Sequence, residues 1–115
     1  MSGFPQPNAH GVYDRADALR FEAEGPRHRL IYWLLRIEAG WIVGHDYQVA
    51  GDRFVQALCL RASELYPSER DALYRGLADL SRELDGSSVA LPRRIVAQIH
   101  AAYVRHAQLD LFEDA

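Results

Sequence analysis

The most apolar part of the chain, residues 30–43, sets the strongest limit on how the rest can fold. Its large apolar side chains recur every three or four residues, as on one face of an α-helix: Leu30, Leu34, Ile37 and Trp41. We therefore predict a central helix from about residue 27 to residue 43, with the other elements packed around it. One alternative stays open at its end, where residues 40–44 form either the last helical turn or a short extended segment between two glycines.

Other segments carry helix start and stop signals. Asp14 can cap a first short helix, and a third helix begins at about residue 49 or residue 52 and ends at residue 66, before a proline. Ser68 caps a fourth helix, which Gly86 closes. Pro92 opens a fifth, because proline is tolerated in the first turn of a helix.

These signals predict an all-α fold, a compact bundle of four to five helices. Residues 14–107 form one domain, residues 1–13 a mobile arm, and residues 108–115 a short C-terminal tail. No apolar run approaches the ~18 residues of a membrane span, and we expect no membrane contact. The N-terminus carries no secretory signal, and the single cysteine, Cys59, fits a reducing compartment, so we expect a cytoplasmic protein.

Charge and residue spacing argue against nucleic-acid binding and against catalysis. Thirteen basic residues face sixteen acidic ones, for a formal net charge of −3, without the basic surplus of a nucleic-acid binder. The five histidines lack metal-ligand spacing, and no metal-binding or nucleophile motif is present. We therefore predict a protein that is not an enzyme and has no catalytic residue, metal or cofactor.

Aromatic side chains are the candidate binding residues of the predicted bundle. Two tryptophans and six tyrosines are many for so small a core, and both residue types are favoured at protein interfaces. Tyr32 and Trp41, on the predicted central helix, are therefore candidate partner-binding residues. The alternative is that the core surrounds this helix on most sides and that both rings are core residues.

The tail carries the most specific motif. Gln108-Leu109-Asp110-Leu111-Phe112 resembles the bacterial sliding-clamp-binding motif, Gln-Leu-(Ser or Asp)-Leu-Phe, at all five positions. The resemblance implies that an extended or loosely turned peptide docks on the replication clamp. In that mode Gln108 hydrogen-bonds through its amide, Leu111 and Phe112 enter an apolar pocket, and Leu109 packs beside it. Other possibilities stay open: the tail folds back onto the bundle or pairs across a homodimer, and the fifth helix ends before Phe112 or continues through it.

The body of the chain is similar to the QslA family of quorum-sensing antiactivators, as a small, acidic, lysine-poor and all-helical chain. Residues 38–46, with the sequence EAGWIVGHD, prompt this comparison. The resemblance implies binding to a LuxR-type transcriptional regulator and a block of its dimerisation through an apolar helix face. We thus predict a small regulatory or adaptor protein that acts by protein–protein contact. Its first candidate partner is the sliding clamp, and its second is a LuxR-type regulator.

Overall fold

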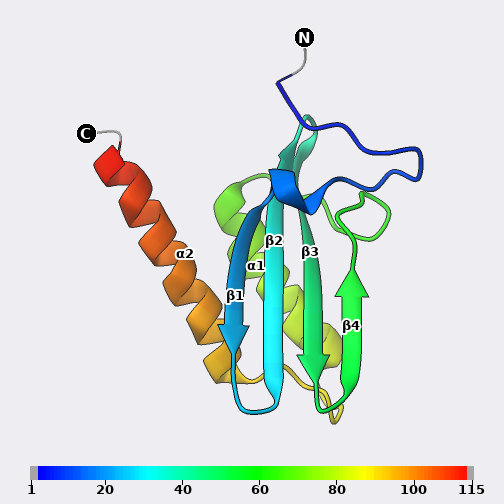
Figure 1. Ribbon diagram of the computed structural model, residues 1–115, viewed down its shortest axis with the longest axis vertical. Coiled ribbons are helices and arrows are strands. Elements are labelled where there is room, and N and C mark those ends of the chain that lie inside the picture. Colours follow the sequence, from blue (N-terminus) through cyan, green and yellow to red (C-terminus); the bar gives the residue numbers. More distant parts are fainter. Residues whose placement is uncertain (1–2, 114–115) are drawn as a thin grey trace.

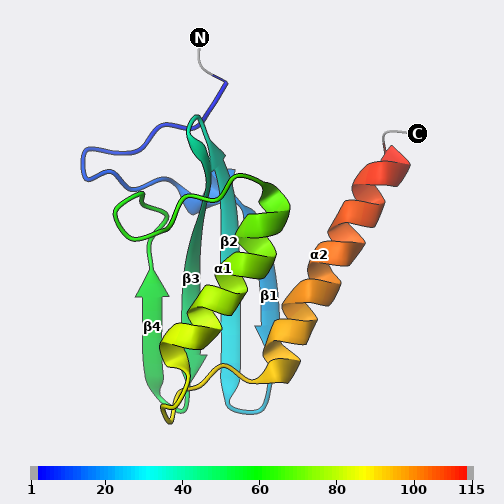
Figure 2. The same cartoon turned by 180° about the vertical axis from the view of Figure 1, so that it is seen from behind.

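The computed structural model describes residues 3–113 and contains an antiparallel sheet with two helices on one face (Figure 1, Figure 2). The strands lie in the order β1-β2-β3-β4, each antiparallel to the next. In chain order the elements are a 3-10 turn (Arg15–Asp17), β1 (Leu19–Glu24), β2 (His28–Ile37), β3 (Gly40–Val49), β4 (Asp52–Gln56), α1 (Glu69–Leu84) and α2 (Arg93–Glu113). The all-α prediction is therefore wrong, because residues 19–56 form a sheet.

Strands β2 and β3 replace the predicted central helix. Alternate residues of β2 lie on opposite faces of the sheet. On the helix-covered face these are Leu30, Tyr32 and Leu34. On the opposite face they are Ile31, Trp33 and Leu35. A strand buried on both faces is almost continuously apolar, a pattern that a buried helix shares. The structure agrees with the extended alternative for residues 40–44, because β3 begins at Gly40 and pairs with β2.

The β3–β4 connection is a turn of Ala50 and Gly51. Their φ angles are 48° and 91°, so both residues are left-handed, as a two-residue hairpin turn with the twist of the sheet requires. The turn sets the register of β4, because it places Asp52 opposite Val49.

Two predicted helices are present, and both pack on the same face of the sheet. The Ser68 hydroxyl accepts a hydrogen bond from the Asp71 amide at 3.1 Å and caps α1. On α1 the leucine stripe Leu73, Leu77 and Leu80 is buried, as are Ile95 and Ile99 of α2, which lies along β1. The fifth predicted helix does continue through Phe112, because α2 ends at Glu113.

The second face of the sheet is covered by chain without long helices. The predicted third helix is wrong, because β4 and a loop up to residue 67 occupy its place. Val12 forms a bridge with Cys59, and the Tyr13 amide donates to the Leu58 carbonyl at 2.8 Å. Residues 12–13 therefore contact this loop, at the upper end of the sheet in Figure 1. Among the described residues no helix is long and apolar enough to cross a membrane.

Candidate functional site

The end of α2 carries the predicted clamp-binding residues. Tyr103 is buried, and the ring of His106 lies edge-on to that of Phe21, with 5.7 Å between their centroids. Beyond these positions Gln108 is exposed, and Leu109 is 61% exposed. Both ribbon views show this end of α2 diverging from β1 and α1 (Figure 1, Figure 2). The start of the motif is therefore open to solvent.

Leu111 and Phe112 follow on α2, and their side chains lie outside the described part of the structure. The backbone of all five motif residues is helical. The clamp-binding mode that the resemblance implies is extended or loosely turned, so docking in that mode needs the last turns of α2 to open.

The two predicted aromatic binding residues lie in the sheet. Tyr32 on β2 is fully buried, and its hydroxyl donates to the Ala72 carbonyl at 3.1 Å. Burial raises its pKa well above the ordinary tyrosine value. Trp41 is partly buried at the start of β3, where its backbone pairs with Tyr66. Tyr32 therefore matches the core alternative, and only Trp41 keeps part of its surface in solvent.

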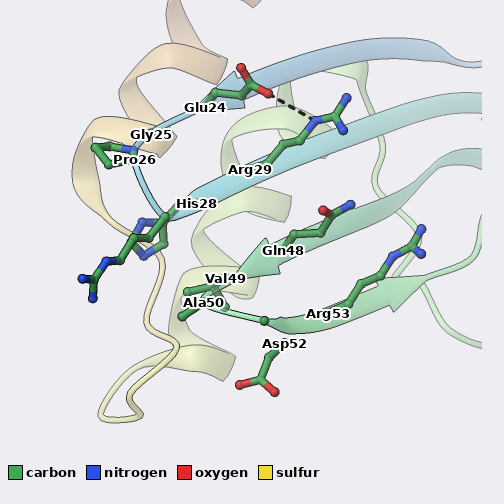
Figure 3. Close-up of a pocket in the computed structure, with 12 residues that line it drawn as sticks. Glu24, Gly25, Pro26, His28, Arg29, Gln48, Val49, Ala50, Asp52 and Arg53 are labelled. Atoms are coloured by element: carbon green, nitrogen blue, oxygen red, sulfur yellow. Dashed lines mark ion pairs between the residues drawn. The ribbon is translucent and has the colours of Figure 1, made fainter.

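A polar cleft of about 470 Å³ lies at the end of the sheet that holds the β1–β2 and β3–β4 turns (Figure 3). One row of side chains crosses all four strands on the face opposite the helices: Glu24, Arg29, Gln48 and Arg53. Figure 3 shows these four side chains standing on the same side of the sheet. They are neighbours because residues in register on adjacent strands share a face.

Both arginines of this row form ion pairs with carboxylates. Arg29 donates through Nε to Glu22 at 2.6 Å and lies 3.5 Å from Glu24. Arg53 donates to Asp46 through Nε at 3.0 Å and through Nη2 at 2.6 Å. The hydrogen bond from Arg29 holds the pKa of Glu22 below its usual value, and the bonds from Arg53 do the same for Asp46.

This row can bind an anionic group. Arg29 uses only Nε in its ion pairs, so its terminal nitrogens can still donate within the described structure. The two arginines lie about 10 Å apart, across Gln48, because each strand spacing is about 4.8 Å. Three nearby carboxylates, Glu22, Glu24 and Asp46, offset their charge, so the cleft has no strong positive field. We interpret the row as an ion-pair network that stabilises this end of the sheet.

Sequence analysis missed this row, although one signal for it was present. Residues 19–24 alternate strictly between apolar and charged side chains, a pattern typical of a half-buried strand. From sequence we instead expect a short helix that Asp14 caps and that Leu19 and Phe21 anchor. Without the strand assignment, no register could bring its acids beside Arg29 or Arg53.

His45 is a buried titratable group between β3 and α1. It is 8% exposed and lines a small cavity of about 70 Å³, and its ring forms no hydrogen bond to a described residue. Burial lowers its pKa, so the ring is neutral at pH 7. On another wall of the cavity the Tyr66 hydroxyl donates to Asp79 at 2.7 Å. Among the side chains that the structure describes, no group of three or more histidine, cysteine or acidic residues is arranged to hold a metal ion.

No protein-family model, curated protein or solved structure is significantly similar to this chain. The QslA comparison assumed an all-helical chain, and that premise is wrong, because residues 38–46 belong to the β2–β3 hairpin and its turn. The antiactivator function itself stays a prediction from sequence.

Proposed function

We propose that this protein is a cytoplasmic, non-enzymatic adaptor that docks on the bacterial sliding clamp through Gln108–Phe112. The observation that supports the proposal is the position of the pentapeptide. It agrees with the clamp-binding pattern at every residue, and its first two side chains are exposed beyond the packed part of α2. An exposed peptide beyond the packed part of a helix can enter a pocket on another protein without disturbing the core.

Opening the end of α2 has a small energetic cost. Terminal helical turns open at free energies near zero, because few contacts hold them. Gln108 and Leu109 are exposed, so their side chains lose little packing when the helix opens. Burying Leu111 and Phe112 in an apolar pocket contributes about 1.5–3 kcal/mol each, which exceeds this cost.

Calorimetric titration into purified sliding clamp tests the proposal. We expect micromolar binding by the intact chain and none by a Leu111→Ala/Phe112→Ala variant. Val104→Ala is the matched control, because Val104 is a 44% exposed apolar residue on the same helix outside the motif. This control should bind like the intact chain. Absence of binding by the intact chain, or equal affinity of the double variant, would show that the motif is not a clamp ligand.

A further inference from the structure

The outer edge of β4 presents unpaired backbone groups. The Ala50–Gly51 turn closes on the pair Val49–Asp52, and a two-residue hairpin turn closes on a hydrogen-bonded pair. Hydrogen-bonded and non-bonded pairs then alternate along the strand, so the amides and carbonyls of Arg53 and Val55 point away from β3. Within the described residues no hydrogen bond uses these four groups.

The alternation of backbone directions is also visible on β3. The amide and carbonyl of Val43 point toward the side where β4 lies, but β4 ends before it reaches Val43. Its amide donates to the Ser63 hydroxyl at 2.9 Å, and its carbonyl accepts from Gln56 Nε2 at 2.9 Å. Beyond the end of β4, side chains thus form the hydrogen bonds of the β3 backbone. Among the described residues, no side chain does so for the outward backbone groups of Arg53 and Val55.

The opposite edge of the sheet is capped at the end of β1 and covered by a helix. The side-chain amide of Gln98 on α2 accepts from the Glu24 amide at 3.1 Å and donates to the Glu24 carbonyl at 3.0 Å. Gln98 therefore bonds to β1 as a neighbouring strand would. Since α2 also packs along β1, this edge is less accessible to a further strand than the edge of β4.

Apolar side chains surround the open edge. Val55 is 51% exposed, Phe54 is 36% exposed, and Leu60 in the following loop is also exposed. Proteins usually protect a free edge with a short strand, charged side chains, proline, a bulge or a covering segment, because such an edge pairs readily with other chains. The five-residue strand β4 carries its two charged residues, Asp52 and Arg53, at the turn end and only apolar and amide side chains beyond them. Apolar residues on an unpaired edge are instead typical of a surface that pairs with a partner strand.

We propose that β4 pairs with β4 of a second copy of this chain, antiparallel and centred on Phe54. The two sheets then form one continuous sheet across a twofold axis. Arg53 of each copy faces Val55 of the other, so all four unpaired backbone groups of each edge form hydrogen bonds. The interface is isologous, since both copies contribute the same strand.

Side-chain complementarity selects this register. Arg53 faces an apolar valine and Asp52 faces Gln56, so no like charges are opposed. A shift by two residues toward the turn would place the two copies of Arg53 opposite each other. In the proposed register the Phe54 rings meet on the helix-covered face, where Tyr47 already lies 6.4 Å from Phe54. The result is a row of four aromatic rings across the twofold axis.

Sedimentation equilibrium over a concentration series that spans the micromolar range tests this proposal, since small interfaces are usually weak. We expect a monomer–dimer equilibrium for the intact chain and a monomer for Val55→Lys, whose new charge faces Arg53 of the second copy. Val104→Lys adds the same charge at an exposed apolar site on α2 and should dimerise like the intact chain. Circular dichroism checks that each variant is folded. A monomeric intact chain, or a Val55→Lys variant that still dimerises, would overturn the proposal.

A crosslink tests the register itself. The central Phe54 pair is not hydrogen-bonded, so its two Cα atoms lie about 4.5 Å apart, within the range that a disulfide spans. Phe54→Cys should therefore form a covalent dimer on mild oxidation, and Val104→Cys should stay monomeric on a non-reducing gel. Equal crosslinking of the two variants would overturn the assigned register.

Discussion

At Gly76 the helix layer comes closest to the sheet. A Cβ atom at this position would lie 2.1 Å from Tyr32 Oη and 3.5 Å from Val43 Cγ1. The hydroxyl of Tyr32 is fixed there, because it donates to the Ala72 carbonyl one helical turn away. One missing side chain on α1 therefore lets a buried tyrosine reach the helix backbone.

The substitution Gly76→Ala should destabilise the protein by about 1–3 kcal/mol, the usual cost of overpacking a core. The cost should be smaller in a Tyr32→Phe background, because the phenylalanine ring lacks the oxygen that the new methyl group meets. Urea unfolding of the four proteins in this double-mutant cycle measures the coupling. Equal penalties in both backgrounds would show that Tyr32 is not the residue that the methyl group displaces.

His45 makes the stability depend on pH in the weakly acidic range. Its pKa is lower in the folded state than the ordinary value of 6.5, because burial disfavours the charged ring. Below that ordinary value the unfolded chain binds more protons at this position than the folded chain does. The stabilisation is therefore complete above about pH 6.5 and falls as the pH drops toward the folded pKa.

We expect the free energy of unfolding to decrease between pH 7 and pH 5, and the decrease to be smaller in His45→Asn. His100 also has a pKa lowered by burial, so part of the decrease should remain in that variant. His10 has an exposed side chain, and His10→Asn is the matched control. Urea unfolding across this pH range measures the three slopes. If the free energy of unfolding falls with pH as steeply in His45→Asn as in the intact chain, His45 does not contribute to this pH dependence.

Among the secondary-structure elements, a helix could be predicted from sequence where one of its own faces is polar and the other is apolar. The stripe of α1 and its Ser68 cap identify a helix from sequence alone, because only one side of the helix meets the core. Strand β2 gives no such signal, because the helices cover one of its faces and residues 3–14 with the β4–α1 loop cover the other. Its apolar run fits a helix and a strand equally well, and only pairing with β3 decides between them.

The candidate sites were likewise predictable only where consecutive residues form them. The clamp-binding pentapeptide was found from sequence, because its residues are consecutive and need no fold to bring them together. The polar row of Arg29 and Arg53 was missed, because its members come from four strands and meet only through register. The free edge of β4 was missed for a related reason. Which backbone groups point outward depends on the Ala50–Gly51 turn, and we had placed this turn at the start of a helix.

The whole molecule has three layers: helices, sheet and a cover of irregular chain. The cover packs on a second apolar cluster that includes Trp33 and Leu58. Tyr13 packs against this cluster, and the guanidinium of Arg15 lies 4.1 Å from the centre of the Trp33 ring. A part of the hydrophobic core therefore depends on a segment that we predicted to be a mobile arm.

Deletion of residues 1–13 should lower the free energy of unfolding by about 2 kcal/mol, because it removes Tyr13 and exposes apolar surface around Trp33. The tryptophan emission should shift to longer wavelength in the folded state. Deletion of residues 108–115 is the control and should change neither quantity, since Gln108 and Leu109 are exposed. Urea unfolding monitored by tryptophan fluorescence compares the intact protein with the two deletion variants. An unchanged emission maximum after the N-terminal deletion would contradict the assigned role of the cover.

The cap that Gln98 and α2 form on β1 also bears on how far the proposed pairing can proceed. In the terms of polymer chemistry, a sheet that pairs only through β4 is a monofunctional unit. Coupling two such units uses up both reactive ends, so growth stops at two and gives a species of fixed stoichiometry. A chain with both edges open would be bifunctional and would grow without limit into fibres. Gln98 and the packing of α2 on β1 thus favour a pair over a filament.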